Sequence, residues 1–403
     1  MSFTGHAPGS GEYRRLIIGL FFAGIATFAQ LYSPQAVLPQ IATDLAVPPA
    51  TAALSVSAAT LGLAASVIGW SIVADRIGRV PAMAIGVLAA TALGFAAPFG
   101  DRIVPLLVLR CAEGVALGAV PAVALAYLAE EVDARHAATA AGSYIAGTTV
   151  GGLLGRIVSG IVAEAADWRT GVWVVAALCA ASAVLFLSLT PRARGFAPSR
   201  LRAHSGPALG ERLLALLRSP QQRALHLQAF LLMGAFVAVY NYLGFHLAAP
   251  PIALPGWLVT LLFLAYLAGT VSSPWAGARA SRVGRYPVLL GSIGVMALGA
   301  ILMLVPATAV VLAGLVLFTA GFFAAHAIAS GWTPVAAPAS SRAQASSLYY
   351  FAYYAGSSLF GWALGLVFLQ AGWAWFLIAV TVLCAASAFV ARAVLRDAPS
   401  GRV

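Results

Sequence analysis

Long apolar runs, separated by proline, glycine and arginine, make up most of this 403-residue chain. An α-helix needs about 20 apolar residues to cross the hydrocarbon core of a membrane. A helix also satisfies its own backbone hydrogen bonds there, where water cannot. The pattern therefore predicts an all-α membrane protein with twelve transmembrane helices, at residues 16–41, 50–74, 81–99, 103–129, 138–163, 170–189, 224–248, 257–280, 287–305, 308–330, 345–370 and 373–394.

One long connection divides these helices into two groups of six. It is rich in Pro, Gly and Arg, and its stretch 209–217 has the pattern of a short amphipathic helix that lies at a membrane interface. The predicted organisation is a tail at residues 1–15, a six-helix bundle at 16–190, a central loop at 191–223, a second six-helix bundle at 224–395 and a tail at 396–403.

The second bundle repeats the first. Residues 74–81, Ala-Asp-Arg-Ile-Gly-Arg-Val-Pro, recur 206 positions later at 280–287 as Ala-Ser-Arg-Val-Gly-Arg-Tyr-Pro. The glycines that begin and end the stretch 147–152 recur 209 positions later, at 356–361. Because each bundle has an even number of spans, we expect two pseudo-symmetric halves that run in the same direction. Duplicated carriers of this kind bind their solute between the halves, near the middle of the membrane.

Composition narrows the class of protein further. Hydrophobic residues make up 61% of the chain and charged residues 9%, against about 45–50% and about 25% in ordinary globular proteins. These values exclude a soluble enzyme, a disordered protein and a secreted disulfide scaffold. Cys111, Cys179 and Cys384 fall singly in three apolar segments, so we expect small core residues and neither disulfides nor a metal site.

The basic residues indicate the topology. All 23 are arginine, and 19 of them lie on alternate connections. Arginine gathers on the cytoplasmic side of membrane proteins, which predicts a multi-pass protein with both termini in the cytoplasm. An alanine-rich chain with arginine and no lysine is typical of a GC-rich bacterial genome, so the expected location is the bacterial inner membrane. The basic loops are expected to contact the lipid bilayer and not nucleic acid. The 19 residues are Arg14, Arg15, Arg76, Arg79, Arg135, the seven from Arg192 to Arg223, Arg279, Arg282, Arg285, Arg342, Arg392, Arg396 and Arg402.

The segment 71–79, Ser-Ile-Val-Ala-Asp-Arg-Ile-Gly-Arg, resembles motif A of the major facilitator superfamily. It lies between the second and third predicted helices, as in that family, and departs at Ser71 and Val80, where the family has Gly and a basic residue. The resemblance implies the major facilitator fold, a small-molecule substrate and a monomer. In the family the motif holds the two halves together in one transport state, which makes these residues the expected latch: Asp75, Arg76, Gly78 and Arg79.

Two further stretches resemble motifs of the same superfamily. Residues 110–114, Arg-Cys-Ala-Glu-Gly, are similar to motif B, and residues 147–152, Gly-Thr-Thr-Val-Gly-Gly, are similar to motif C of drug–proton antiporters. Thr148 stands where motif C has Pro. The wider pattern resembles bacterial inner-membrane permeases that export sugars and drugs, which implies efflux by exchange with protons.

Glycines recur at helical spacing in the fifth predicted helix. Gly147, Gly151 and Gly155 form a smooth stripe that allows close approach of another helix, with Gly152 beside it. Gly361 and Gly365 are expected to do the same in the second bundle. Static packing and a surface on which the halves slide are both open interpretations.

Charges inside the membrane are the strongest functional signal, because a buried ionisable group is costly unless it is paired. Arg110 and Glu113 lie three residues apart in the fourth predicted helix, and Arg156 lies at similar depth in the fifth. We expect this trio in a solvent-reachable crevice, with Glu113 binding and releasing a proton. The alternatives are a structural Arg–Glu pair that joins the two helices, and an arginine that receives an anionic substrate.

Polar and aromatic side chains of the first, seventh, tenth and eleventh predicted helices are candidates for a central cavity. In the superfamily the first, seventh and eleventh helices line the transport path. Tyrosines also anchor helices at membrane interfaces, and His326 is either a packed hydrogen-bonding group or a second proton site. The candidates are Tyr32, Gln35, Tyr240, Asn241, His326, Tyr353 and Tyr354.

No motif for nucleotide hydrolysis or hydrolytic catalysis occurs in the chain. Without lysine there is no phosphate-binding Gly-x-x-x-x-Gly-Lys loop, and no metalloprotease or nucleophile-elbow motif is present. We therefore expect no enzyme and no cofactor beyond a proton gradient. The leading hypothesis is a proton-coupled carrier that exports a small organic solute by alternating access. The alternatives are an uptake carrier for an organic anion and a membrane receptor or scaffold that transports nothing.

Overall fold

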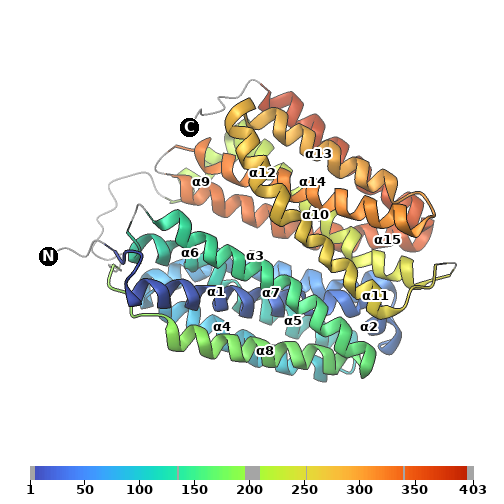
Figure 1. Cartoon of the computed structure of the whole chain (residues 1–403), viewed down its shortest axis with the longest axis horizontal. Coiled ribbons are helices and arrows are strands. Elements are labelled where there is room, and N and C mark those ends of the chain that lie inside the picture. The colour runs from blue at the N-terminus through green and yellow to red at the C-terminus, as the bar shows by residue number, and fades with distance from the viewer. Residues whose placement is uncertain (1–4, 134–135, 196–208, 251, 339–340, 397–403) are drawn as a thin grey trace. The chain divides into compact units, whose positions relative to one another are not determined.

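The computed structural model describes residues 5–133, 136–195, 209–250, 252–338 and 341–396, and their regular elements are helices. The chain divides into a first unit, Met1–Val47 with Ala58–His204, and a second unit, Pro48–Ser57 with Ser205–Val403. Figure 1 labels the elements of both. Arg135, Arg200, Arg202 and Arg402 of the predicted basic connections, and the predicted tail after residue 396, lie outside the described residues.

The helices of the first unit are α1 (Gly11–Tyr32), η1 (Ser33–Val37), α2 (Leu38–Asp44), α3 (Pro49–Ile77), α4 (Arg79–Ala96), η2 (Ala97–Phe99), α5 (Ile103–Leu117), α6 (Ala119–Glu131), α7 (Ala137–Ala165) and α8 (Trp168–Leu189). Those of the second are α9 (Leu209–Arg218), α10 (Pro220–Ala248), α11 (Gly256–Leu261), η4 (Leu262–Tyr266), α12 (Leu267–Val283), α13 (Arg285–Leu302), α14 (Thr308–Val335), α15 (Arg342–Val390) and η6 (Ala391–Leu395). Residues 49–57, at the start of α3, belong to the second unit.

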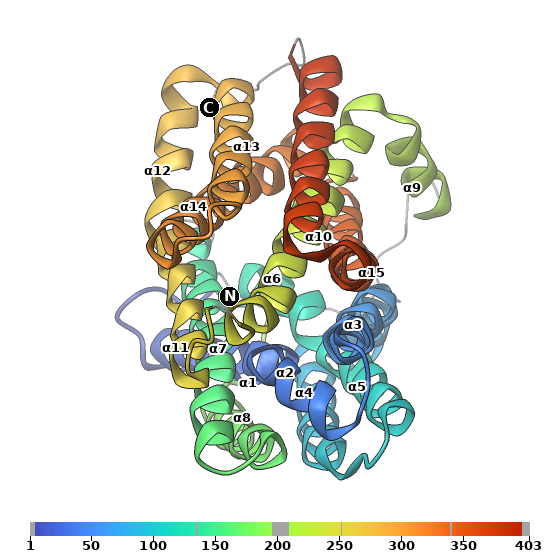
Figure 2. The same cartoon turned by 90° about the vertical axis from the view of Figure 1, so that its right-hand side faces the viewer.

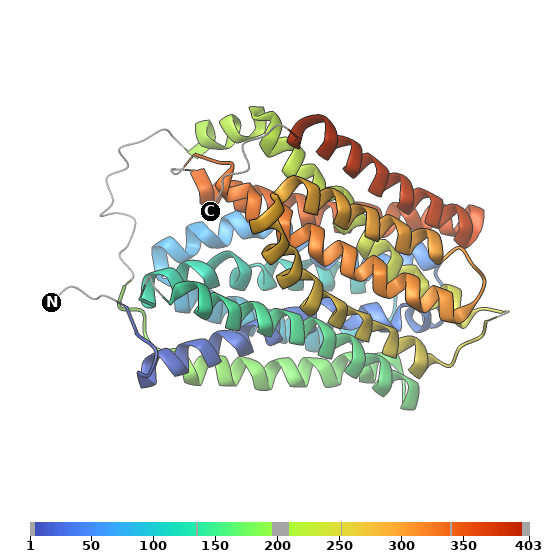
Figure 3. The same cartoon turned by 45° about the horizontal axis from the view of Figure 1, so that its top comes forward.

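Eleven helical stretches in the described part of the chain are long and apolar enough to cross a membrane. The last of them, Arg342–Leu395, has 54 residues and would be about 80 Å long at 1.5 Å per residue, far more than the roughly 30 Å of hydrocarbon. Gly372, with φ of 78°, interrupts it. The chain turns back there, as the orange and red parts of α15 show (Figure 3). Counting its two parts separately gives the twelve predicted spans.

Helix ends differ from the predicted spans where local capping extends them. α1 begins at Gly11, five residues before the predicted start, because the Ser10 side chain accepts the Tyr13 N–H at 3.2 Å. α10 begins at Pro220, four residues early, with Ser219 as its cap. Pro is favoured at the first helical position because it has no N–H to leave unsatisfied.

The first predicted span is not continuous, which corrects the prediction. A 3₁₀ segment, η1, separates α1 from α2. Pro34 has no N–H to give to the carbonyl of Gln30, four residues earlier, and its ring crowds that carbonyl. The break therefore leaves backbone carbonyls that need other donors. The Ser33 N–H and, at 3.1 Å, the Ser33 hydroxyl donate to the Gln30 carbonyl, and further donors come from neighbouring helices.

In the first unit, α1 packs against α7 and α8, as the end-on view shows (Figure 2). α4 packs against α5, α6 and α8. The glycine stripe makes the first of these contacts possible. A Cβ on Gly147, Gly151 or Gly155 would overlap backbone atoms of Phe21, Ile25 or Ala29 in α1. The stripe therefore supports static packing inside one unit. Gly152 lies off the stripe.

In the second unit, α10 takes the place of α1 and packs against α15 and α14. Gly356 approaches the Phe230 backbone as Gly147 approaches Phe21, and both pairs differ by the repeat offset of 209 (356 − 147 and 230 − 21). Gly361 and Gly365 depart from the prediction, because they face the side chains of Asn241 and Tyr242, not a backbone. Their role is to leave room for polar side chains.

The repeated turn is also visible in the backbone. Gly78 and Gly284 adopt φ of 102° and 91°, with ψ of 157° and 159°, at the start of α4 and α13. Only glycine adopts this conformation without strain. The duplication inferred from the sequence is therefore confirmed at these two turns.

The predicted amphipathic helix of the central loop is present as α9. Its Leu216 is buried beside Ala337 and Ala345, while Leu214 and Leu217 are exposed. α9 packs against α10 and α15. Its place at a membrane interface stays a prediction.

Candidate functional site

An ion pair lies at the centre of the first unit. Arg110 and Glu113 are one helical turn apart on α5, and the guanidinium Nη1 donates to the Glu113 carboxylate Oε2 at 2.5 Å. The two side chains are 1% and 0% exposed. Each of these buried charges depends on the other for its stability, because removing either partner would leave an uncompensated charge in an apolar surrounding.

Arg110 also donates to two backbone carbonyls at the break in the first membrane span. Its Nη1 donates to the Gln30 carbonyl at 3.3 Å, and its Nη2 donates to the Leu31 carbonyl at 2.6 Å. The Gln30 carbonyl is the one that lost its helical donor at Pro34. The pair thus lies within α5 and connects α5 to α1, which corrects the alternative of an ion pair between the fourth and fifth predicted helices.

The Glu113 carboxylate is only half satisfied. Oε2 is bound to Arg110, whereas Oε1 is buried and accepts no hydrogen bond of good geometry from residues that the structure describes; the Gln30 side chain lies near the carboxylate. A proton can bind to Oε1 without first breaking the Arg110 contact. Both side chains are sealed from solvent in this conformation, contrary to the expected solvent-reachable crevice. Proton exchange at Glu113 therefore requires a conformation in which water reaches it.

Arg156 occupies a second polar cluster on the other side of the same break. Its Nε donates to Gln35 Oε1 at 2.7 Å, its Nη1 donates to the Gly152 carbonyl at 2.5 Å, and its guanidinium lies 4.0 Å from the centre of the Tyr32 ring. Gly152 leaves room for this guanidinium, since a Cβ there would come within 3.1 Å of Nη1. Nearby, the Ser159 hydroxyl donates to the Ser33 carbonyl at 2.7 Å.

These contacts place five of the predicted residues around residues 30–37. Arg110, which is paired with Glu113, donates to the carbonyls of residues 30 and 31, while Arg156 contacts Tyr32 and Gln35. The sequence predicts that Arg156 lies with Glu113. In the structure, Arg156 contacts neutral groups of η1, α1 and its own helix α7. The break in the first span, marked in the sequence by Pro34, is what brings the two clusters together.

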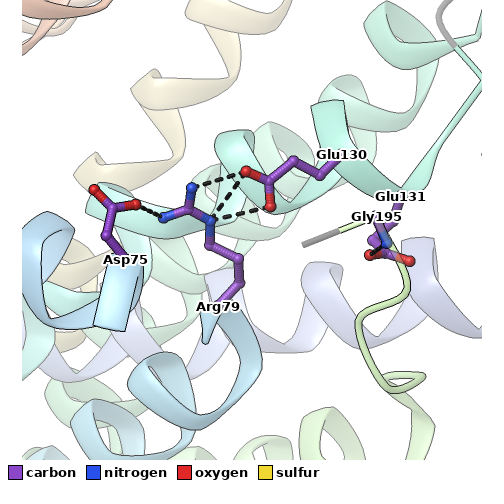
Figure 4. Close-up of polar contacts among 5 residues, drawn as sticks. All are labelled: Asp75, Arg79, Glu130, Glu131 and Gly195. Carbon is purple, nitrogen blue, oxygen red and sulfur yellow. Dashed lines mark hydrogen bonds and ion pairs between the residues drawn. The ribbon is translucent and has the colours of Figure 1, made fainter. Parts of the chain in front are cut away.

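A third network occupies the end of the first unit that carries the motif A residues. Arg79 Nη1 donates to Asp75 Oδ1 at 2.6 Å, and Arg79 Nη2 donates to Glu130 Oε1 at 2.8 Å (Figure 4). Arg79 Nε completes a fork on Glu130, at 3.1 Å from Oε2. Arg76 is exposed. The network joins α3, α4 and α6 of one unit, and the latch between halves stays a prediction.

Sequence reasoning missed the two acids at the end of α6. Glu130 completes the Arg79 network, and Glu131 Oε1 accepts the backbone N–H groups of Arg194 and Gly195, each at 2.6 Å (Figure 4). Glu131 thus fixes the chain where it leaves the first bundle. The sequence feature that could have indicated this network is a pair of adjacent acids at the end of an apolar run, because the turn with Arg76 and Arg79 offers basic partners for them.

The predicted residues of the second unit fall into two groups. Tyr240 Oη lies 2.7 Å from Thr319 Oγ1, and Asn241 Nδ2 donates to the Gly361 carbonyl at 3.4 Å. His326 Nδ1 lies 3.0 Å from Tyr349 Oη, and its ring centre is 4.9 Å from that of Tyr353.

These groups surround aromatic contacts of α10, α14 and α15. Tyr354 contacts Tyr353 edge to face at 5.1 Å. Tyr240 and Tyr354 are buried, whereas His326 and Tyr353 are half-buried. All are candidates for a solute path, and that role stays a prediction.

Comparison with known proteins identifies the family to which the chain is similar. A sequence model described as Major Facilitator Superfamily matches residues 20–250. The chain is 38% identical to the inner membrane transport protein YnfM of Escherichia coli, over 91% of this chain and 87% of that protein. It is 36% identical to the uncharacterized MFS-type transporter YybF of Bacillus subtilis, over 91% of this chain and 89% of that protein.

The fold agrees with a solved structure of the same class. The crystal structure of the nucleoside transporter NupG superposes with a TM-score of 0.75 over 94% of this chain and 99% of that chain, at 16% identity. At that identity the likeness shows the fold alone. With a family match over more than half of its length and two long relatives above 30% identity, the chain belongs to the Major Facilitator Superfamily and is a multi-pass membrane transporter, not an enzyme.

Proposed function

We propose that this transporter exports a small organic solute in exchange for protons, and that Glu113 is the proton-binding residue. The observation that carries the proposal is the half-satisfied Glu113 carboxylate, whose Oε1 is buried and accepts no hydrogen bond of good geometry from the described residues while Oε2 holds Arg110. Of the acids in the chain, Glu113 alone lies well inside a predicted span. Intramembrane carboxylates of this kind are typical of proton relays.

Protonation of Glu113 would change the forces on the first membrane span. With Glu113 ionised, Arg110 is neutralised while it holds the Gln30 and Leu31 carbonyls. With Glu113 neutral, Arg110 keeps its charge but loses its carboxylate counter-charge, which is costly in an apolar surrounding. The protonated state therefore favours rearrangement of the break. Tyr32 and Gln35, which contact Arg156, lie on the same break.

The direction of transport and the topology complete the proposal. The likeness of residues 147–152 to motif C of antiporters supports export. The distribution of arginine supports a bacterial inner membrane location with both termini in the cytoplasm. We propose a monomer, in which each of two conformations is favoured by the proton or the solute that it binds better.

Flux in reconstituted vesicles tests the direction. Purified protein is placed in liposomes with an imposed pH gradient, and a panel of labelled sugars, amino acids, carboxylates and drugs is screened for gradient-driven movement. We expect a solute to move against the direction of the protons. Movement with the protons would replace export by uptake, and no protein-dependent flux of any solute would favour a receptor or scaffold.

Variants of Glu113 test the proton site. Glu113→Gln should abolish gradient-driven flux and leave solute counterflow, because counterflow needs no net proton movement. Glu164→Gln, at an exposed acid on α7, should leave both unchanged. If Glu113→Gln lowers expression, Glu113→Asp provides the second variant, with a shifted pH profile of flux. Unaltered proton coupling in both Glu113 variants would remove the residue from the mechanism.

A further inference from the structure

A ring cluster in the second unit surrounds one imidazole. Phe322 and His326 lie one turn apart on α14, with nearly parallel rings 5.9 Å apart. From α15, Tyr353, Tyr349 and Tyr350 approach the imidazole at 4.9, 5.7 and 6.3 Å between ring centres. Four aromatic rings from two helices thus contact a single polar ring, well inside two membrane-spanning helices.

The cluster is closed on one side and open on another. Tyr349 and Phe322 are each 1% exposed, whereas Tyr350 is 40% exposed and His326 and Tyr353 are half-buried. The exposed edges of Tyr350, Tyr353 and His326 present a mixed surface of ring faces and polar groups.

One nitrogen of His326 is available for a ligand. Nδ1 lies 3.0 Å from Tyr349 Oη, and a phenol that donates to Nδ1 leaves the proton of the neutral imidazole on Nε2. Nε2 makes no hydrogen bond within the described part of the chain. In the tautomer in which Tyr349 donates to Nδ1, the half-buried imidazole presents an N–H donor beside the rings. A ligand with an acceptor next to its own ring matches this arrangement.

Charge limits the class of ligand further. Residues 220–396, which include the helices from α10 to α15, contain no Asp or Glu. Nothing in these helices would neutralise a buried cation, and burying an unneutralised cation is costly. A neutral ligand meets no such penalty. An anion is also costly to bury, but this part of the chain has arginines that can offset a negative charge and no acid that can offset a positive one.

We propose that His326, Tyr350 and Tyr353 bind the planar ring of an aromatic solute that carries a hydrogen-bond acceptor and no positive charge. The solute ring stacks against the tyrosine rings, and the imidazole Nε2–H donates to the acceptor. This inference rests on the proposed function, because it names the class of solute that the carrier moves.

Equilibrium dialysis of the purified full chain in lipid nanodiscs tests the class with three matched probes. Labelled benzoate has the ring and the acceptor, cyclohexanecarboxylate has the acceptor without the aromatic ring, and benzylamine has the ring with a positive charge. We expect saturable binding of benzoate and at least about tenfold weaker binding of the other two, because ring–ring contacts contribute about 0.5–1.5 kcal/mol each beyond area burial.

Variants assign the binding to the cluster. Tyr353→Leu should weaken benzoate binding about 3- to 10-fold, and His326→Phe, which keeps a ring and removes the donor, about tenfold. Phe351→Leu is the matched control, since Phe351 lies two residues from Tyr353 on the other side of α15 and is 48% exposed. Thermal unfolding checks that each variant is folded.

Any of three results would overturn the inference. The first is the absence of saturable benzoate binding, and the second is equal binding of benzoate and cyclohexanecarboxylate. The third is an equal effect of Tyr353→Leu and Phe351→Leu on benzoate binding. If proton-driven flux of a non-aromatic solute persisted alongside any of these results, the proposed function would stand and only the class of solute would be wrong.

Discussion

The two units share a backbone plan and differ in the chemistry of their centres. Gly147 with Phe21 and Gly356 with Phe230 make the same close helix contact, and Gly78 and Gly284 make the same turn. The centre of the first unit, however, holds buried arginines, a glutamate and a broken helix, whereas the second holds stacked rings. Duplication has kept the contacts that fix helix packing and allowed the side chains around them to diverge.

The difference can be located at equivalent positions. With the offset of 209, Pro34 corresponds to Leu243 and Arg156 corresponds to Gly365 (34 + 209 and 156 + 209). α10 therefore continues without a break where the first span is interrupted. At the second position the Tyr242 side chain fills the space that the missing side chain leaves, and its hydroxyl donates to the Gly361 carbonyl at 2.8 Å. The first unit thus has buried charged side chains at its centre, whereas the second unit has packed aromatic rings.

Arg110→Ala should have the largest effect on stability, because it leaves Glu113 buried without its counter-charge. We expect a loss of about 3–5 kcal/mol in the free energy of unfolding, measured by unfolding in detergent. The double variant Arg110→Leu with Glu113→Leu should recover most of this stability and still lack proton coupling. Arg102→Ala, at an exposed arginine, is the control. An equal loss of stability in that variant would show that the Arg110–Glu113 pair does not stabilise the fold more than a surface arginine does.

Leu243→Pro tests the continuity of α10 against the break of the first span. A proline inside a helix costs about 3 kcal/mol, so this variant should be strongly destabilised. Pro34→Ala should change the unfolding midpoint much less and lower transport, since the new N–H competes with Arg110 for the Gln30 carbonyl. Normal transport by Pro34→Ala would show that the break has no role in the cycle.

Alanine at glycine positions separates the two kinds of helix contact. Gly151→Ala should destabilise the first unit by about 1–3 kcal/mol, because its Cβ would overlap the α1 backbone. Gly361→Ala should cost less, since its Cβ would meet side-chain atoms no nearer than 3.2 Å. Unfolding midpoints measure both, and a larger effect at Gly361 would contradict this distinction.

The smallest effect on stability is expected at the motif A network. Glu130→Gln weakens the fork on Arg79, which is partly exposed, so the stability loss should stay within about 1 kcal/mol. Turnover in vesicles should fall further than solute binding does. Ser281→Ala, at the position that corresponds to Asp75 in the second unit (75 + 206), is the control and should leave turnover unchanged.

Part of the candidate site followed from the sequence. The membrane depth of Arg110, Glu113 and Arg156 could be read from the apolar runs, because charges are rare there. Their partners could not. Arg156 contacts Gln35, 121 residues away, and no local pattern encodes a contact at that separation. Glu130 was missed for the same reason, because its partner Arg79 is 51 residues away.

Local rules made part of this protein predictable. The length of the apolar runs gave the number of spans, and the recurring Gly-Arg turn revealed the duplication, whereas the break at Pro34 was not predicted. The tertiary structure alone decided which carbonyls Arg110 binds, which glycines meet a backbone and which rings surround His326. These depend on distances between helices, and such distances arise only when all the helices pack together.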